Sequence, residues 1–153
     1  MATASTPATA VTPDGPGRTP GAAGDCPATS AEPGRRVAID YVDFVHWGGR
    51  EYLSVTPDEG WGSAPITPVD LGSVVFVVGC SYTRLNDLTL ASPPPPGDRD
   101  ASYLAAGTPV YAVRGWPTSC RLAAVPTDQP AGTVHLYAAL DPAAPTATPA
   151  TCT

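Results

Sequence analysis

Alternating hydrophobic and polar positions predict β-strands across the central part of the chain. Val37, Ile39 and Tyr41 recur at every second position, which is the period of a half-buried strand. The alternation slips at Asp43, where an inward-facing residue is due, and a β-bulge near Val42 would explain the slip. The pattern therefore predicts a first strand over residues 37–46, interrupted close to its end.

The segment 73–82 carries the strongest strand pattern in the sequence. Val74, Phe76 and Val78 lie on one face, and Val75 and Val77 lie on the other. Because both faces are apolar, we expect this strand at the centre of a sheet. Shorter patterns bounded by Gly and Pro predict the remaining strands at 51–55, 102–104, 108–113, 121–125 and 133–140.

This spacing of strands and turns predicts an all-β fold, a small antiparallel barrel or sandwich of six or seven strands. The Gly48-Gly49 pair favours a tight hairpin turn between the first two strands. Two long loops, 56–71 and 84–101, interrupt the pattern. The chain divides into a disordered Ala/Thr/Pro-rich tail or linker over 1–34, a β domain over 35–141, and a disordered C-terminal tail over 142–153.

Composition narrows the classes of function. The chain contains 20 Pro and 15 Gly, which disfavour long helices, and its net charge is -6. The basic residues are scattered, so we expect no nucleic-acid partner. No apolar run reaches the length of a membrane span. We also expect the protein to be a monomer. No signal peptide is visible at the start of the chain, which keeps a cytoplasmic location open as an alternative to an extracytoplasmic one.

The four cysteines indicate two disulfides and an oxidising compartment. Four cysteines allow three pairings. Their positions favour Cys80–Cys120 inside the core and Cys26–Cys152 tying the two ends of the domain together. The spacing does not fit a zinc site, because there is neither a C-x-x-C motif nor a pair of neighbouring histidines.

Catalytic and cofactor motifs are not found. The segment 79–83 comes nearest to a nucleophile elbow but ends in Thr83 instead of glycine. His46 and His135 are the two histidines, and each fits a strand surface better than a catalytic site. Asp98 and Asp100 fit turn hydrogen bonds better than a calcium loop. The sequence has no glycine-rich phosphate loop, so we expect no bound nucleotide. We also expect no other cofactor and no metal.

Three tryptophans lie in or beside Gly/Pro turns: Trp47, Trp61 and Trp116. Large aromatic side chains at such positions close the open ends of a small barrel. Aromatic side chains on loops can also form a surface that binds sugars or peptides. The three tryptophans are therefore the candidate ligand contacts of the domain.

Four segments of the chain resemble a known group of proteins. Residues 100–116 and 121–124, together with 42–44 and 71–75, resemble an uncharacterised family of small exported or lipoprotein-type β domains from GC-rich Gram-positive bacteria. Those domains often follow an export signal and a Thr/Pro/Ala-rich linker. The family has no known activity or catalytic residue. The resemblance implies an extracytoplasmic location in the cell envelope or outside the cell.

These observations predict a non-catalytic envelope or secreted domain that binds an unknown protein or carbohydrate ligand. Two alternatives remain open. The first is a protease-inhibitor-like protein that presents the Pro-rich loop 84–101 to an enzyme. The second is a small hydrolase with a site built around His46 or His135.

Overall fold

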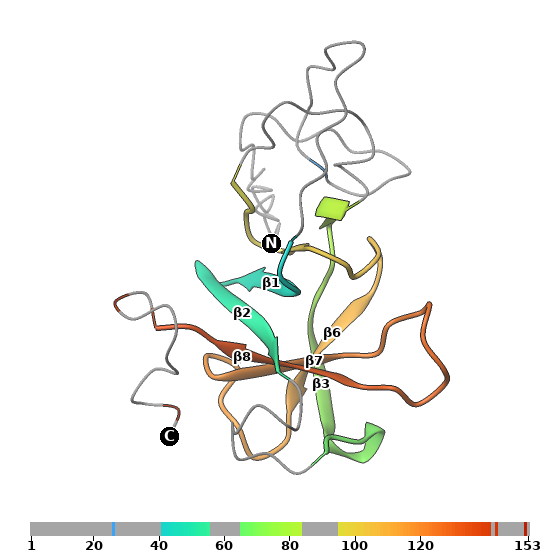
Figure 1. The fold of residues 1–153 in the computed structure, drawn as a ribbon. Helices are drawn as coiled ribbons and strands as arrows, with labels where there is room; N and C mark the ends of the chain where they lie inside the picture. Colours follow the sequence, from blue (N-terminus) through green and yellow to red (C-terminus); the bar gives the residue numbers. More distant parts are fainter. Residues whose placement is uncertain are drawn as a thin grey trace, which may run out of the picture.

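The computed structural model describes residues 26, 41–55, 65–83, 95–141, 143 and 152, and its strands form one curled, half-barrel sheet (Figure 1). The spatial order of its eight strands is β3-β6-β7-β8-β2-β1-β5-β4. A short 3-10 helix, η2 (Pro68–Asp70), precedes β3. The strand bounds are β1 Phe44–Trp47, β2 Arg50–Val55, β3 Leu71–Val77, β4 Cys80–Ser81, β5 Asp100–Ala101, β6 Pro109–Val113, β7 Arg121–Ala124 and β8 His135–Ala139.

The predicted all-β class is confirmed, but two of its details are wrong. In the described part of the chain, the sheet has eight strands instead of six or seven, and it is mixed, because β4 and β5 run parallel. The other strand pairs are antiparallel. No helix among the described residues is long and apolar enough to cross a membrane. The predicted tails lie outside the described residues, apart from Cys26, Ala143 and Cys152.

The hairpin between β1 and β2 forms where the two glycines predict it. Gly48 and Gly49 both have positive φ angles, 59° and 70°, which a hairpin turn of this twist requires at both central positions. The turn sets the register of the hairpin, in which Trp47 pairs with Arg50 and Phe44 pairs with Leu53. The strand itself begins at Phe44, so the expected slip near Val42 falls before β1.

The segment expected as one central strand breaks into β3 and β4. These two strands lie at opposite ends of the sheet order, yet only Val78 and Gly79 separate them along the chain. The Val78 amide donates to the Thr108 carbonyl at 2.9 Å, and the Gly79 amide donates to the Arg99 carbonyl at 2.7 Å. Successive amides of an extended chain point to opposite sides. One continuous segment therefore contributes to both ends of the sheet order, which is why β3 is not central.

The core fills the inner side of the curl. Alternate residues of the strands point inward, and the largest of those that are fully buried are Val45, Tyr52, Val110, Leu122 and Tyr137. Other buried residues form two smaller clusters. One gathers around Phe44, Cys80 and Tyr82, and the other around Val113, Ala123 and Leu136.

The turn before β5 joins the β1–β2 hairpin to the segment that carries β3 and β4. The buried Asp100 carboxylate accepts a hydrogen bond from the Gly97 amide at 2.6 Å. Asp98 accepts one from the Gly49 amide at 2.9 Å. Arg99 has a φ of 70°, unusual for a residue other than glycine, and its Nε donates to the Val77 carbonyl at 3.1 Å. These acidic side chains therefore make turn hydrogen bonds, as the sequence predicts.

Two disulfides are present, but the expected pairing is wrong. Cys26 pairs with Cys80, and Cys120 pairs with Cys152. Cys80 lies in β4 at the end of the sheet order, while Cys120 directly precedes β7 on the other side of the hairpin. The Cys80–Cys120 bridge therefore does not form. Cys80 of β4 instead binds Cys26, and Cys120, next to β7, binds Cys152; both partners lie outside the sheet.

Removal of the Cys26–Cys80 disulfide tests the assigned pairing. We expect the double variant Cys26→Ala/Cys80→Ala to lose about 4 kcal/mol of unfolding free energy, because the bridge restricts a long loop in the unfolded chain. The sequence separation is 54 residues. Urea unfolding of both proteins measures the difference, with Cys120→Ala/Cys152→Ala as the matched comparison. A double variant as stable as the wild type would contradict the assigned bridge.

Candidate functional site

The turn between β6 and β7 presents Trp116 at the surface on a well-defined backbone. Gly115 has a φ of 81°, and the Trp116 amide donates to the Val113 carbonyl at 3.1 Å. The Pro117 carbonyl then accepts hydrogen bonds from two amides, those of Cys120 and Arg121. The backbone of the turn is thus fixed at both ends, and the turn holds its tryptophan in a defined position.

Arg121 supports the indole ring of Trp116. The guanidinium carbon lies 3.7 Å from the ring centroid, which is the geometry of a cation–π contact. Arg121 is buried, and burial lowers the pKa of its guanidinium. Trp116 keeps 37% of its surface exposed. A rigidly supported and partly exposed indole of this kind can stack on a sugar ring or on an apolar side chain.

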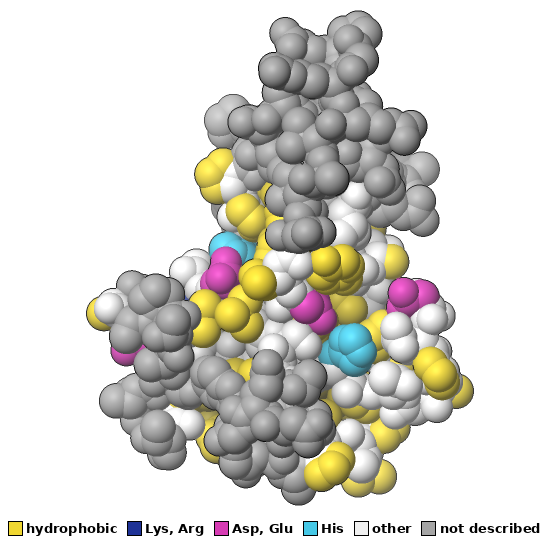
Figure 2. Space-filling model, in the orientation of Figure 1, with side chains coloured by type: hydrophobic (Ala, Val, Ile, Leu, Met, Phe, Trp, Pro, Cys, Tyr) yellow, Lys and Arg dark blue, Asp and Glu magenta, His cyan; other side chains and the backbone are white. Residues whose placement is uncertain are grey.

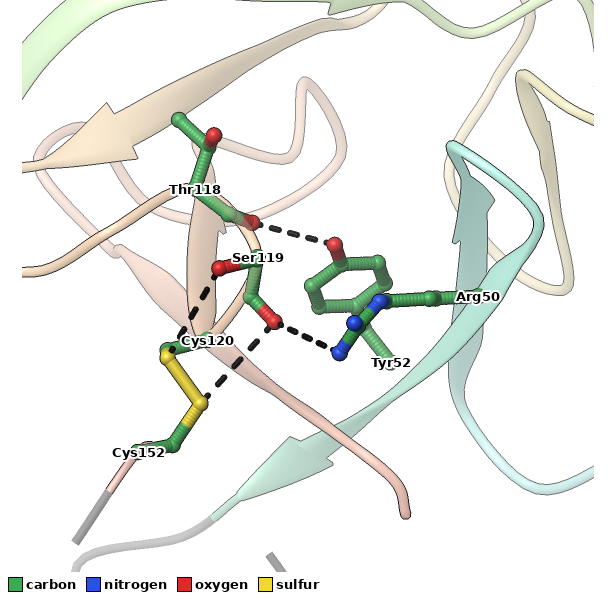
Figure 3. The surroundings of a disulfide bond; sticks show 6 residues. All are labelled: Arg50, Tyr52, Thr118, Ser119, Cys120 and Cys152. Carbon is green, nitrogen blue, oxygen red and sulfur yellow. Dashed lines mark hydrogen bonds between the residues drawn. A yellow bond between two sulfur atoms is a disulfide. The ribbon is translucent and has the colours of Figure 1, made fainter. Parts of the chain in front are cut away.

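Side chains from β2 and a disulfide hold the same turn in place (Figure 3). The Tyr52 hydroxyl donates to the Thr118 carbonyl at 3.0 Å, and Arg50 Nη1 donates to the Ser119 carbonyl at 3.5 Å. Cys120, the next residue, forms the disulfide with Cys152. The turn is therefore attached to β2 by hydrogen bonds and to Cys152, which lies outside the sheet, by a covalent bond.

The other two candidate tryptophans are placed differently. The Trp47 ring stacks on the Phe76 ring, with the centroids 4.9 Å apart and the planes at 9°, and it packs against the inner core. Arg50, the cross-strand neighbour of Trp47, reaches the Trp116 turn through the Ser119 carbonyl. The β1–β2 hairpin that carries Trp47 therefore contacts the turn that carries Trp116. Trp61 lies outside the described residues.

A second polar group, which we call the Asp43 cluster, consists of Asp43, Ser102, His135 and Tyr137. The Tyr137 hydroxyl donates to the Asp43 carboxylate at 3.2 Å, and Ser102 Oγ donates to it at 3.3 Å. Ser102 is fully buried, and its Oγ also accepts a hydrogen bond from the Phe44 amide at 2.8 Å. Asp43 thus joins β8 to the segments that flank β1 and β5.

His135 faces this carboxylate without a hydrogen bond to it. Its Nδ1 lies 3.6 Å from Asp43 Oδ2, and this buried nitrogen has no hydrogen-bond partner in the described part of the chain. Ser102 contacts the carboxylate and not the imidazole. A hydrolase triad requires the nucleophile to contact the base. The Asp43 cluster does not have this order of contacts.

His46 forms a separate pair with Glu51 across the β1–β2 hairpin. Its Nε2 lies 2.9 Å from Glu51 Oε2, and its ring packs edge-on against Phe44. Figure 2 shows each of the two histidines beside an acidic side chain on the same face of the molecule. The His46 pair is a cross-strand contact of the kind that stabilises sheets. Among the described residues, no three His, Cys, Asp or Glu side chains are grouped closely enough to hold a metal ion.

Comparisons with protein-family models, with curated proteins and with solved structures found no match for this chain. The resemblance to exported domains of Gram-positive bacteria therefore stays a prediction. The Trp116 turn and the Asp43 cluster are therefore the two features from which we infer a function.

Sequence reasoning missed the two residues that support these groups. In the sequence, Arg121 is a single arginine in a short predicted strand. No sequence pattern indicates that its guanidinium lies over Trp116. Asp43 does leave a signal, because it interrupts the hydrophobic alternation at an inward position. The structure shows the reason: its carboxylate accepts the hydrogen bonds of Tyr137 and Ser102.

The buried hydroxyl of Tyr137 predicts a loss of stability in alkali. Burial, and then the charge and hydrogen bond of Asp43, raise the pKa of Tyr137 far above its usual value. Above about pH 10 the unfolded chain releases this proton while the folded chain keeps it. The free energy of unfolding should therefore fall by about 1.4 kcal/mol per pH unit from this residue alone.

Urea unfolding between about pH 8 and pH 11 measures this slope for the wild type and for Tyr137→Phe. The variant should lose about 1 kcal/mol at neutral pH, because one hydrogen bond is missing. Its free energy of unfolding should fall less steeply in alkali than that of the wild type. Some decline remains, because burial also raises the pKa values of Tyr41 and Tyr52. Equal slopes in the two proteins would contradict this role of Tyr137.

Proposed function

We propose that this domain is a non-catalytic binding module that acts in the cell envelope or outside the cell, with Trp116 as its main ligand contact. The observation that carries the proposal is the arrangement around Trp116. An exposed indole lies on a buried guanidinium, in a turn fixed by a disulfide and by two side chains of β2. Such rigid presentation lowers the entropy cost of binding.

The two disulfides support the proposed location. All four cysteines of the chain are paired. Disulfides persist in oxidising compartments and are rare in reducing ones. Small β domains outside the cytoplasm rely on such bonds because their cores are modest. This supports an extracytoplasmic site of action over the cytoplasmic alternative.

The use of the polar side chains supports a non-catalytic role. Ser102 is buried and makes its hydrogen bonds to the Phe44 backbone and to Asp43. The Asp43 carboxylate accepts hydrogen bonds that join strands, and the His46–Glu51 pair links the two strands of a hairpin. These contacts hold the sheet together. The inhibitor alternative rests on the loop 84–101, of which residues 84–94 lie outside the described part.

Binding of soluble oligosaccharides tests the proposal directly. A panel of neutral and N-acetylated oligosaccharides is added to the oxidised domain, and the melting temperature and the heat of binding are recorded. We expect at least one ligand to raise the melting temperature. Trp116→Ala should weaken its binding at least about tenfold, because the stacking surface is lost.

Tyr103→Ala is the matched control. Tyr103 is another exposed aromatic residue, and its hydroxyl donates to the Tyr41 carbonyl, away from the Trp116 turn. This variant should bind as the wild type does. Recovery of the oligosaccharide intact supports a binding module, whereas its cleavage, lost in His46→Ala or His135→Ala, would establish the hydrolase alternative. Equal binding by Trp116→Ala and the wild type would remove Trp116 as the contact.

A further inference from the structure

The turn between β6 and β7 brings together arginines that are separated in the sequence. The structure describes four arginines, and three of them meet at this turn: Arg50, Arg114 and Arg121. Arg114 and Arg121 flank Trp116 along the chain, and Arg50 reaches the turn from β2 through the Ser119 carbonyl. The segment 101–127, which contains the turn, has no acidic residue, although the net charge of the whole chain is -6. The turn is therefore a basic segment of an acidic protein.

Arg50 and Arg114 keep hydrogen-bond donors that a ligand can use. Arg114 Nε donates to the Leu71 carbonyl at 3.0 Å, and Arg50 Nη1 donates to the Ser119 carbonyl at 3.5 Å. In the described part of the chain, neither guanidinium forms an ion pair with a carboxylate. A guanidinium has five N–H donors in one plane, and two of them together fit the two oxygens of a carboxylate.

The acidic side chain close to Arg114 is engaged by other groups. The Asp70 carboxylate accepts hydrogen bonds from the Thr67 amide and hydroxyl, both at 2.8 Å. These hydrogen bonds, and to a smaller extent the charge of Arg114, hold the pKa of the Asp70 carboxyl below its usual value. Asp70 therefore stays ionised on its own turn and leaves the Arg114 fork to another acceptor.

The Tyr52 hydroxyl reports the balance of charge on the β2 side of the turn. It donates to the Thr118 carbonyl. Burial raises the pKa of Tyr52, and the charge of Arg50 lowers it by more than the charge of Asp98 raises it. Of these two charges, the arginine therefore has the larger effect at this position.

We propose that the ligand of this module is an acidic saccharide, whose sugar ring stacks on Trp116 and whose carboxylates pair with Arg50 and Arg114. This inference rests on the proposed function, in which Trp116 is the main ligand contact. Arg121 covers one face of the indole, so a sugar ring stacks on the other face. Stacking on an indole does not distinguish neutral from acidic sugars. The arginines on the two sides of the turn supply that specificity, because opposite charges at the edge of an interface select the partner.

Matched pairs of oligosaccharides test the charge of the ligand. Each pair contains an oligomer of galacturonic, glucuronic or mannuronic acid and its methyl ester, which keeps the sugar ring and removes the charge. Titration calorimetry on the oxidised domain measures both affinities. At least one acid should bind about tenfold more tightly than its ester, because only the acid pairs with the two guanidinium groups. Its affinity should fall between about 0.05 M and about 0.5 M salt, whereas that of the ester should not.

Arg114→Gln tests the arginine without disturbing the indole. The variant should bind the acid about threefold to fivefold more weakly and the ester as the wild type does, because one exposed ion pair is lost. Arg99→Gln is the matched control. Arg99 Nε also binds a backbone carbonyl, that of Val77, at the opposite end of β3 from Leu71. Equal weakening by the two variants would overturn the proposal, because the effect would then follow net charge and not the position of the arginine.

The outcomes separate the acidic ligand from the proposed function itself. Equal binding of acid and ester, lost in Trp116→Ala, would overturn the acidic ligand and leave the binding module in place. Binding of the neutral oligosaccharides alone would have the same consequence. Tighter binding of a short single-stranded DNA than of any acid would replace the carboxylate by a phosphate ligand. Failure of the acids, the esters and the neutral oligosaccharides to bind would overturn both proposals.

Discussion

The structure depends on the passage of the chain through Val78 and Gly79. Their successive amides donate in opposite directions, one toward Thr108 and the other toward Arg99. This divergence places β3 at one end of the sheet order and β4 at the other. The curl follows from it, because a single segment must reach both ends of the sheet. The buried Asp100 and the Cys26–Cys80 disulfide then fix the β4 end of this segment.

The Trp116 turn is likewise held by a disulfide and by hydrogen bonds. A disulfide anchors Cys120, and Tyr52 and Arg50 bind the carbonyl groups beside it. The domain therefore has two disulfides, one at β4 and one near the exposed indole. A modest core can support a rigid surface in this way, because the disulfides restrict the unfolded chain and lower its entropy. The proposed binding role requires this rigidity.

Local features of the sequence predicted local structure well. The two glycines predicted the β1–β2 turn, and short patterns bounded by Gly and Pro predicted β2, β6, β7 and β8 within about two residues. The prediction that 73–82 forms one central strand was wrong. Its two apolar faces do not reveal that the segment pairs with β6 before Gly79 and with β5 after it. The disulfide pairing was wrong for a related reason: spacing along the chain says nothing about which strand ends are neighbours. The contact between Arg121 and Trp116 likewise depends on the tertiary fold.

Disulfide mapping of the unreduced protein tests this account most directly. Trypsin cleaves after arginine, and the eight arginines of the chain place each of the four cysteines in a different peptide. The account predicts two cross-linked pairs, the peptides 19–35 with 51–84 and 115–121 with 122–153, which hold Cys26–Cys80 and Cys120–Cys152. A link between the Cys80 and Cys120 peptides, or four free thiols, would contradict the frame on which both the curled sheet and the Trp116 surface depend.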